Sequence, residues 1–407
     1  MVASGSAIGQ IISVLVSPIL TRFYSPEDFG IFGVYASILG IFTVVASLRY
    51  EFAIPLPEED VIAANILTLC FLLLLVSVLL SGIIVGIFGI PIVEWTNSPG
   101  LKPYLWLIPL GLLGAGIYQI LSYWATRKRD FRRLGRTRFN RGVWRALLQV
   151  GLGWVQEGPL GLLFGQLAGE TAGSFSLAFA IWKEDRDVFK AIQWQKIRSV
   201  GARYKRFPLL SSLAGFIDSL GLQLPQLLIA SFYGAEVAGW FALGQRVIAI
   251  PLNIVMDAVA QVYFGEASNW VRNESGSVFR RILKLTGRLA LIGGLPVVLI
   301  CVLAPWLFKL VFGSSWEMAG LYVRIMGFMF AVRFVITPFS QTLNILERQE
   351  VYLFWDIIRF FLVVGGLLIG RFLKVSDVGA IIIYSLTMAV SYLILGYVVF
   401  NISKHKI

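Results

Sequence analysis

Apolar residues in this chain come in long blocks, many of them about 20 residues long or longer. A helix needs roughly 20 consecutive apolar residues to cross the hydrocarbon core of a bilayer. The 407 residues are 57% apolar and only 14% charged, with a mean hydropathy of +0.78, whereas soluble domains carry roughly 45–50% apolar and about 25% charged residues. Twelve crossings would use about 240 residues. The pattern therefore predicts a polytopic helical membrane protein without room for a sizeable soluble domain.

The blocks predict an all-α integral membrane protein with twelve transmembrane helices in two sets of six. The first set lies at about 3–22, 29–48, 61–90, 104–125, 142–156 and 160–182, and the second at about 209–232, 237–257, 285–312, 319–345, 352–371 and 378–400. We expect two pseudo-symmetric six-helix bundles around a central cavity. The N-terminal bundle is residues 1–182, a basic cytoplasmic linker covers 183–208, and the C-terminal bundle is residues 209–407.

Basic residues predict which way round the helices sit. The stretch from Arg127 to Arg141 holds eight Lys and Arg residues, and the stretch from Lys183 to Arg206 holds another eight. With the N-terminus in the cytoplasm, 25 of the 35 basic residues fall on the inner side and four on the outer side. Because positively charged loops stay in the cytoplasm, this bias predicts that both termini are inside. The net charge of +12 then reports topology and contacts with anionic membrane lipids, with no nucleic-acid partner.

Few residues could support enzyme or metal chemistry. The one histidine, His405, lies two residues from the C-terminus, and both cysteines, Cys70 and Cys301, lie inside apolar runs. A lone cysteine in such a run behaves as a small hydrophobic residue. We therefore predict no catalytic residue, no metal site, no cofactor and no disulfide. The N-terminal apolar stretch has no basic leader and no small-residue cleavage site, so we do not expect a cleaved signal peptide.

Two similar segments occupy equivalent places in the predicted halves. FYSPEDFGIF runs from Phe23 to Phe32 after the first span, and FYGAEVAGWF runs from Phe232 to Phe241 after the seventh. Phe, Tyr, Glu, Gly and Phe match at the same five positions, at an offset of 209. Each half has an even number of spans, so the two would share one orientation. This predicts a parallel repeat and alternating access by rocking of the two bundles.

The segment ASGSAIGQIISVLVSPILTRFYSPEDFGIFGVYASI, residues 3–38, resembles the opening of bacterial polysaccharide-biosynthesis membrane proteins of the Wzx type. The resemblance rests on Gln10, Pro18, Thr21-Arg22, Tyr24-Ser25-Pro26-Glu27 and Gly30. RYEFAIPLPEEDVIAAN, residues 49–65, continues it, and ALGQRVIAIP, residues 242–251, resembles the eighth-helix segment. These oligosaccharide flippases belong to an exporter superfamily that also contains multidrug extruders and the lipid II flippase.

The resemblance implies a function and a location. Such a protein moves undecaprenyl-diphosphate-linked oligosaccharide from the inner to the outer leaflet of the bacterial cytoplasmic (inner) membrane, for O-antigen, capsule or exopolysaccharide synthesis. It is a transporter and not an enzyme. The implied partners are the lipid-linked oligosaccharide itself and, beside it, the polysaccharide polymerase and the chain-length machinery.

A diphosphate that crosses hydrocarbon needs compensating positive charge, and arginine supplies planar, permanently charged donors for phosphate oxygens. A cation at mid-membrane costs at least about 2.5–3.5 kcal/mol, so a central one is a functional candidate by default. Arg246, near the middle of the eighth span, is the first candidate for binding the diphosphate, and Arg333, deep in the tenth, is another. Arg49 and Arg22 lie at the ends of spans two and one. The related lipid II flippase uses arginines at comparable helices, which favours both.

Other roles stay open for these charges. Arg246 could form a structural ion pair with Asp218 or Glu170, and Arg49 and Arg22 could be headgroup anchors. Asp218, Glu170 and Glu51 are candidates for binding a coupling ion or for pairing with a cation. Arg145, Lys309 and Arg324 lie close enough to span ends to snorkel. Asp356 and Arg359 are three residues apart on one helix, which predicts an internal ion pair.

Two rival functions remain. A multidrug or cation extruder of the same superfamily would need acidic groups to dominate its cavity, whereas the central charges here are mainly basic. A membrane glycosyltransferase or polymerase would need sizeable outer loops with placed carboxylates or histidines. The longest predicted outer connection, about residues 91–103, contains only Glu94 as an acid, which disfavours an enzyme.

Overall fold

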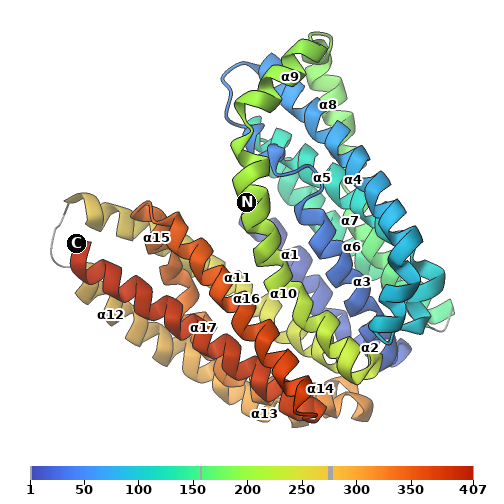
Figure 1. Ribbon diagram of the computed structural model, residues 1–407, viewed down its shortest axis with the longest axis vertical. Coiled ribbons are helices and arrows are strands. Elements are labelled where there is room, and N and C mark those ends of the chain that lie inside the picture. The colour runs from blue at the N-terminus through green and yellow to red at the C-terminus, as the bar shows by residue number, and fades with distance from the viewer. Residues whose placement is uncertain (1, 156–157, 274–277, 407) are drawn as a thin grey trace. The chain divides into compact units, whose positions relative to one another are not determined.

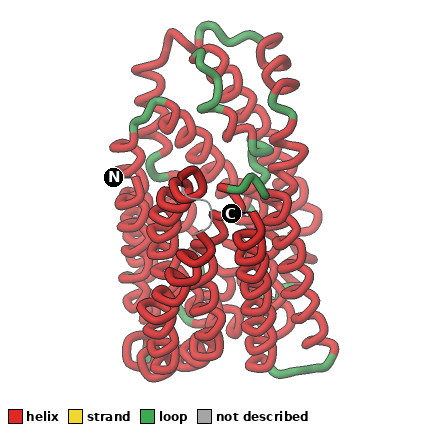
Figure 2. The backbone as a smooth tube through the Cα atoms, turned by 90° about the vertical axis from the view of Figure 1, so that its left-hand side faces the viewer, coloured by secondary structure: helices red, strands yellow, loops and turns green. Residues whose placement is uncertain are grey.

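The structure, a computed structural model, describes residues 2–155, 158–273 and 278–406. Within these ranges the regular secondary structure is helical throughout, with short connections between helices (Figure 2). The chain divides into two compact units, Met1–Gly239 and Trp240–Ile407. We describe each unit by itself.

Unit 1 contains ten helices and the first turn of an eleventh, among the described residues (Figure 1). They are α1 (Val2–Leu15), α2 (Ser17–Phe23), α3 (Pro26–Val44), α4 (Asp60–Trp95), α5 (Leu107–Arg127), α6 (Phe131–Val155), α7 (Leu160–Thr171), α8 (Ser174–Phe189), α9 (Trp194–Arg203) and α10 (Ser212–Tyr233). Short helical turns at Tyr50–Ala53, Pro99–Tyr104 and Phe207–Ser211 join some of them. Because α10 packs on α3, the unit ends after Gly239 and includes the predicted seventh span. The predicted division at 182 and 209 stays a prediction.

Unit 2 takes up α11 (Ala235–Asn273) from Trp240 onward. Its other helices are α12 (Val278–Leu289), α13 (Leu295–Phe312), α14 (Glu317–Ile336), α15 (Gln341–Ile345), α16 (Gln349–Phe372) and α17 (Asp377–Lys406), with short turns at Ala290–Gly294, Ser314–Trp316 and Thr337–Ser340. The main contacts run from α13 to α14, from α14 to α17 and from α17 to α16. Trp316, Tyr322, Phe330 and Phe339 are fully buried there and are the largest fully buried side chains among the described residues of this unit.

Some of the predicted spans are interrupted, including the tenth, in which the turn Thr337–Ser340 separates α14 from α15. The span predicted at 3–22 is divided into α1 and α2 just before Pro18, whose ring nitrogen has no hydrogen to donate to the preceding turn. The span predicted at 160–182 is divided into α7 and α8 at Gly173, which has a φ of +97°. A methyl group on Gly173 would lie 2.8 Å from Cβ of Thr137. Only glycine adopts this backbone and this close approach without strain.

The basic stretches form helices and not loops. Most of the segment from Arg127 to Arg141 is the first part of α6, and much of 183–206 belongs to α8 and α9. Arginine and lysine have high helix propensity, so a run of them extends a helix beyond its apolar part. α4 has 36 residues and α11 has 39. At about 1.5 Å per residue both exceed the roughly 30 Å hydrocarbon thickness, as expected for α4 from its long apolar block.

Nine helical segments in the described part of the chain are long and apolar enough to cross a membrane, and the shorter segment Ile8–Phe23 is also apolar. The most apolar is Asp60–Trp95, with a mean hydropathy of 2.9 over its best window. Its apolar side chains are widely exposed, including Leu79 at 68% and Ile87 at 63%. A contiguous exposed apolar face of this kind is stable against lipid and not in water. The protein is therefore an all-helical, multi-pass membrane protein. The count of twelve and the orientation stay predictions.

Candidate functional site

A strained turn follows α3 in unit 1. Leu48 and Arg49 have φ values of +50° and +62°, so two consecutive residues other than glycine adopt the left-handed conformation. Each such residue costs roughly 1–2 kcal/mol relative to ordinary backbone. Strain of this kind persists only where the surrounding contacts hold the turn in place, and it concentrates at functional sites.

Glu51 provides those contacts. The hydroxyl of Ser47 donates a hydrogen bond to Oε2 of Glu51 at 2.5 Å, and Nε2 of Gln119, on α5, donates to Oε1 at 2.7 Å. Glu51 is only 1% exposed and lies in the short turn Tyr50–Ala53, outside the membrane-crossing helices. Burial raises the pKa of Glu51, against the opposite effects of these hydrogen bonds and of the Arg49 charge. The carboxylate thus ties both sides of the strained turn to α5.

The turn directs the Arg49 side chain toward α10 and into a cavity. The guanidinium carbon lies 4.9 Å from the centre of the Phe52 ring, a cation–π distance. A methyl group on Gly215 would lie 2.4 Å from Nη2, so the guanidinium packs directly against the α10 backbone. Among the described residues, Nε of Arg49 is buried without a hydrogen-bond partner, and no carboxylate forms an ion pair with this side chain. Arg49 therefore offers a partly buried positive charge that no ion pair neutralises among the described residues.

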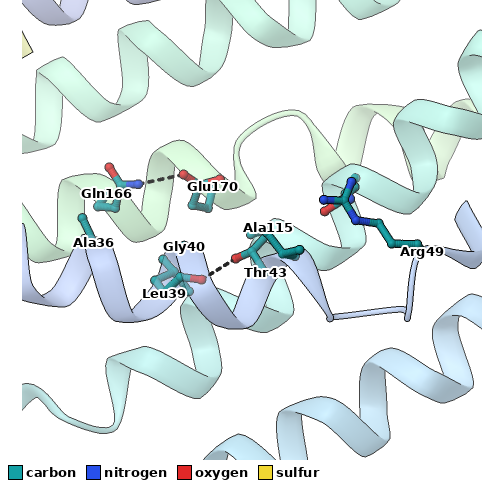
Figure 3. Close-up of a pocket in the computed structure, with 10 residues that line it drawn as sticks. Ala36, Leu39, Gly40, Thr43, Arg49, Ala115, Gln166 and Glu170 are labelled. Atoms are coloured by element: carbon teal, nitrogen blue, oxygen red, sulfur yellow. Dashed lines mark hydrogen bonds between the residues drawn. The ribbon is translucent and has the colours of Figure 1, made fainter. Parts of the chain in front are cut away.

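The cavity has a volume of about 300 Å³ and lies wholly within unit 1 (Figure 3). Its lining comes from α3, the strained turn, α5 and α7: Ala36, Leu39, Gly40, Thr43, Val44, Arg49, Ala115, Gln119, Gln166 and Glu170. Figure 3 shows Arg49 toward one end of this lining and Gln166 with Glu170 toward the other. The lining therefore combines a cation, a carboxylate, two amides and a floor of small residues.

Glu170 is held by several donors. Arg141, on α6, donates to its Oε2, Nη2 of Arg145 lies 3.1 Å from its Oε1, and Nε2 of Gln166 donates to the same oxygen at 2.8 Å. Arg145, predicted to snorkel to the surface, instead pairs with this carboxylate. With Arg49 and Glu51, these groups are three arginines and two carboxylates, so the surroundings of the cavity carry a net charge of +1. Such a site suits an anion with several hydrogen-bond acceptors.

In unit 2, Arg246 is half-buried on α11 and Arg333 is half-buried on α14. Nη2 of Arg333 donates to Oδ1 of Asn253 at 2.8 Å, while its Nε is buried without a hydrogen-bond partner among the described residues. Next to Arg246, Nε2 of Gln245 donates to the hydroxyl of Tyr384 at 3.0 Å. Unit 2 therefore also holds two partly buried arginines among polar neighbours.

The remaining predicted residues fall into clear groups. Arg22 is exposed at the end of α2, and Asp218 is half-buried on α10. Arg49, Glu51 and Glu170 are gathered around one cavity in unit 1, whereas Arg246 and Arg333 belong to unit 2. Glu170 already pairs with Arg141 and Arg145. The predicted pairing of Arg246 with Asp218 or Glu170 stays a prediction.

Three other basic residues within the predicted spans have structural partners. The predicted pair of Asp356 and Arg359 is present at 3.0 Å, with both side chains almost fully buried. Lys309 pairs with Glu317 at 2.9 Å, and Nε of Arg324 donates to the carbonyl of Val302 at 3.0 Å. The last two side chains are exposed, in keeping with positions toward span ends. No group of three or more potential metal ligands occurs in the described part of the chain.

Sequence reasoning missed Gln119, Gln166 and Gly215. An amide within an apolar span was the available signal for the two glutamines, because a polar side chain in a membrane helix needs a partner. Gln166 also precedes Glu170 by four residues, the spacing at which helical side chains meet. Nothing in the sequence around Gly215 indicated that Arg49 would pack on it, since that contact joins residues 166 positions apart.

The family described as "Polysaccharide biosynthesis protein" matches residues 19–320 of this chain. Among curated proteins, the chain is similar to "Succinoglycan biosynthesis transport protein ExoT" of Rhizobium meliloti (strain 1021), with 24% identity over 399 residues, 94% of this chain and 76% of that protein. It is also similar to "Teichuronic acid biosynthesis protein TuaB" of Bacillus subtilis (strain 168), with 26% identity over 142 residues, 34% of this chain and 29% of that protein.

Solved structures share the fold at low sequence identity. One is a multidrug resistance MATE family transporter of the MOP superfamily, with a TM-score of 0.76, 15% identity and coverage of 98% of this chain and 96% of that one. Another is the lipid II flippase MurJ, with a TM-score of 0.72, 13% identity and coverage of 99% and 89%. At these identities the similarity concerns the fold alone.

Proposed function

This chain belongs to the family of polysaccharide biosynthesis proteins, and from that premise we propose that it is a flippase for undecaprenyl-diphosphate-linked oligosaccharide. It is a multi-pass membrane protein and a transporter, not an enzyme. A relative aligned over almost the whole chain is named as a transport protein of succinoglycan biosynthesis. The cargo would be carried from the inner to the outer leaflet of the bacterial inner membrane.

The observation that carries the proposal to particular residues is the charge of the unit 1 cavity. Arg49 places a guanidinium that forms no ion pair among the described residues on a strained turn beside the cavity, and the two amides and Glu170 belong to the same lining. Arg49 would bind the diphosphate, because a guanidinium matches the geometry of phosphate oxygens. Gln119 and Gln166 would donate to or accept from polar groups next to it. In unit 2, Arg246 and Arg333 would provide further cationic contacts, and Arg22 would meet the headgroup at the end of α2.

The mechanism we propose uses twelve spans with both termini in the cytoplasm. The two six-helix halves, residues 1–182 and 209–407 joined by the basic linker 183–208, would alternate between inner and outer access. Asp218, Glu170 or Glu51 would bind the coupling ion or balance a cation during the cycle. The polysaccharide polymerase and chain-length machinery would act next on the delivered cargo, and anionic lipids would contact the basic helices.

The alternative function is extrusion of a cationic drug. A fold shared with a multidrug transporter keeps this alternative open. The unit 1 cavity opposes it, because its surroundings carry net positive charge and its carboxylate is already paired with two arginines. A cationic ligand would be repelled from such a site.

The deciding experiment is transport by the purified protein in vesicles. One arm supplies undecaprenyl-diphosphate oligosaccharide, and the other supplies a cationic dye. We expect transport of the lipid-linked oligosaccharide, and loss of that transport in Arg49→Ala. Arg324→Ala is the matched control, because it also removes an arginine from a predicted span. Among the contacts described, Arg324 bonds only to the carbonyl of Val302. Transport of the dye alone would overturn the proposal.

Arg246 separates a cargo contact from a structural pair. If it binds the diphosphate, Arg246→Ala abolishes transport with nearly normal folded yield, and Arg246→Lys recovers only part, because lysine lacks the planar fork. If it is half of a buried pair, Arg246→Ala lowers the free energy of unfolding by about 3–5 kcal/mol. Removing Asp218 or Glu170 as well would then restore the yield. Complementation and thermal unfolding of purified variants distinguish the two roles.

A further inference from the structure

The two similar segments of the sequence meet in space. The first turns of α3, from Pro26 to Gly30, contact the first turns of α11, from Ala235 to Gly239, and both lie within unit 1. These residues come from the two ten-residue segments Phe23–Phe32 and Phe232–Phe241. The contact therefore joins two equivalent places of the proposed repeat.

Two glycines make this contact possible. A methyl group on Gly30 would lie 1.7 Å from the carbonyl oxygen of Ala235 and 2.6 Å from its carbonyl carbon. A methyl group on Gly239 would lie 1.7 Å from the carbonyl oxygen of Pro26 and 2.7 Å from its carbonyl carbon. In each case the obstacle is backbone, which cannot move aside as a flexible side chain can. The hydrogen of each glycine points at the oxygen, as in the Cα–H···O contacts of closely packed helices.

The two contacts are images of each other. Adding the repeat offset of 209 to Gly30 gives Gly239, and adding it to Pro26 gives Ala235. Gly30 therefore packs against the carbonyl of Ala235, and its counterpart Gly239 packs against the carbonyl of Pro26. A contact in which one patch meets its own equivalent is the mark of a twofold interface. This reciprocity supports the predicted parallel repeat from contacts that the sequence comparison did not use.

The surrounding bonds fix the ends of both helices. Ser25 caps α3 by accepting a hydrogen bond from the amide of Asp28. At the equivalent position, Gly234 has a φ of +91° and begins α11 without a side chain. Nε2 of Gln226, on α10, donates to the carbonyl of Ala238 at 3.0 Å. The first turn of α11 is thus held against α3 and α10, which both belong to unit 1.

The chain passes from unit 1 to unit 2 at the second glycine. Gly239 is the last residue of unit 1, and the rest of α11 from Trp240 belongs to unit 2. We propose that Gly30 and Gly239 form a glycine latch, a paired backbone contact that closes the transport path at the ends of α3 and α11 and must open in each cycle. Because glycine has no side chain, the two backbones pack closely without interdigitated side chains. The latch can therefore close tightly and still separate. The inference rests on the proposed transport function. Under the proposed orientation, the latch would lie on the outer side of the membrane.

Alanine substitutions test the latch. Gly30→Ala and Gly239→Ala each add one methyl group against a backbone carbonyl and prevent closure. We expect each to lower transport of undecaprenyl-diphosphate oligosaccharide at least tenfold. Gly86→Ala and Gly265→Ala are matched controls, because a methyl group at either meets nothing within 4 Å, and Gly265 lies on α11 itself. We expect the controls to stay within twofold of the unsubstituted protein. Wild-type transport by both latch variants would overturn the proposal.

A second measurement leaves the glycines in place, in case the latch variants fold poorly. Glu27 and Glu236 are exposed residues on the helix turns that contain the two glycine contacts. Because Cys70 and Cys301 are buried, Glu27→Cys with Glu236→Cys accepts two spin labels selectively. We expect pulsed electron spin measurements in nanodiscs to give a short distance and a second, longer one whose population changes with undecaprenyl diphosphate. A single unchanging short distance in a preparation that transports cargo would overturn the latch. Absence of transport by the unsubstituted protein would instead overturn the proposed function.

Discussion

Two arginines, the buried Arg359 of unit 2 and the half-buried Arg49 of unit 1, differ in how the protein accommodates them. In unit 2, Arg359 pairs with Asp356 at 3.0 Å and lies 4.8 Å from the Trp355 ring, and all three residues are on α16. In unit 1, Arg49 lies over Phe52 on a left-handed turn and, among described residues, forms no ion pair. Both have a guanidinium over an aromatic ring, and Arg49 also lines the cavity of unit 1.

The difference shows which buried charges serve the fold and which are available to a ligand. An ion pair three residues apart on one helix is satisfied locally and can form as soon as the helix does. Arg49 depends on a strained turn, which Glu51 ties to Ser47 and Gln119. Structure that holds a charge in a costly conformation beside a cavity indicates function.

Removing the unit 2 arginine gives the largest expected effect, and it is on stability. Arg359→Ala removes the ion pair of the buried carboxylate of Asp356, at a cost of about 3–5 kcal/mol. We expect a large fall in folded yield and in thermal midpoint, measured on the purified protein. Arg359→Ala with Asp356→Ala should recover most of the loss. If the single variant were as stable as the unsubstituted protein, the pair would not be structural and the comparison would fail.

Removing the unit 1 arginine should affect transport and not stability. Arg49→Ala removes the cation but breaks no ion pair among the described residues. No buried carboxylate therefore loses a salt-bridge partner. We expect transport to fall about 100-fold, equivalent to roughly 2.7 kcal/mol, with a thermal midpoint close to that of the unsubstituted protein. The rate in vesicles and thermal unfolding are measured on the same preparation. A stable Arg49→Ala protein with full transport would leave Arg246, Arg333 and Arg22 as the remaining candidates.

This pair of residues also shows how far sequence reasoning reaches. The Asp356–Arg359 pair was predictable, because helical spacing alone brings the two side chains together. Arg49 was predictable as a candidate only through its place at a span end and the family resemblance. Its environment was not predictable, since Gln119 and Gly215 are distant in sequence and the left-handed backbone at Leu48 has no glycine to indicate it.

The fold shows the same division. Apolar block lengths predicted helices at every proposed span, and in the described ranges each of those blocks is helical over most of its length. The blocks could not show that the first and sixth spans are broken, because the breaks depend on Pro18 and on the crowding of Gly173 against Thr137. Nor could they show that the basic stretches continue as helix, since charge marks the side of the membrane more strongly than it marks secondary structure.

Replacing the guanidinium with an ammonium sharpens the comparison. Arg49→Lys keeps the positive charge but removes the planar set of donors, so contacts to phosphate oxygens become single. We expect a loss of about tenfold in transport, intermediate between the unsubstituted protein and Arg49→Ala. Arg324→Lys is the control, because Arg324 bonds to a carbonyl away from the cavity. Equal losses in Arg49→Lys and Arg49→Ala would mean that charge alone does not support binding.

The smallest effect concerns Glu51, which supports the Arg49 turn. Burial raises the pKa of Glu51 above its usual value near 4.5. A carboxyl whose folded-state pKa is raised contributes stability that is fully present below the unfolded value and is lost as the pH rises through the folded value. Glu51→Gln does not ionise, so the thermal midpoint of the unsubstituted protein should fall relative to this variant as the pH increases from 4.5. The change should correspond to about 1 kcal/mol or less, because Ser47 and Gln119 still donate to the ionised form.

Glu58→Gln, on an exposed side chain in the next connection, serves as the control. Thermal unfolding between pH 4 and 8 gives the two differences. A gap that widens in favour of the unsubstituted protein at high pH would show that the Ser47 and Gln119 bonds outweigh burial, and that the strained turn is held by an ionised carboxylate.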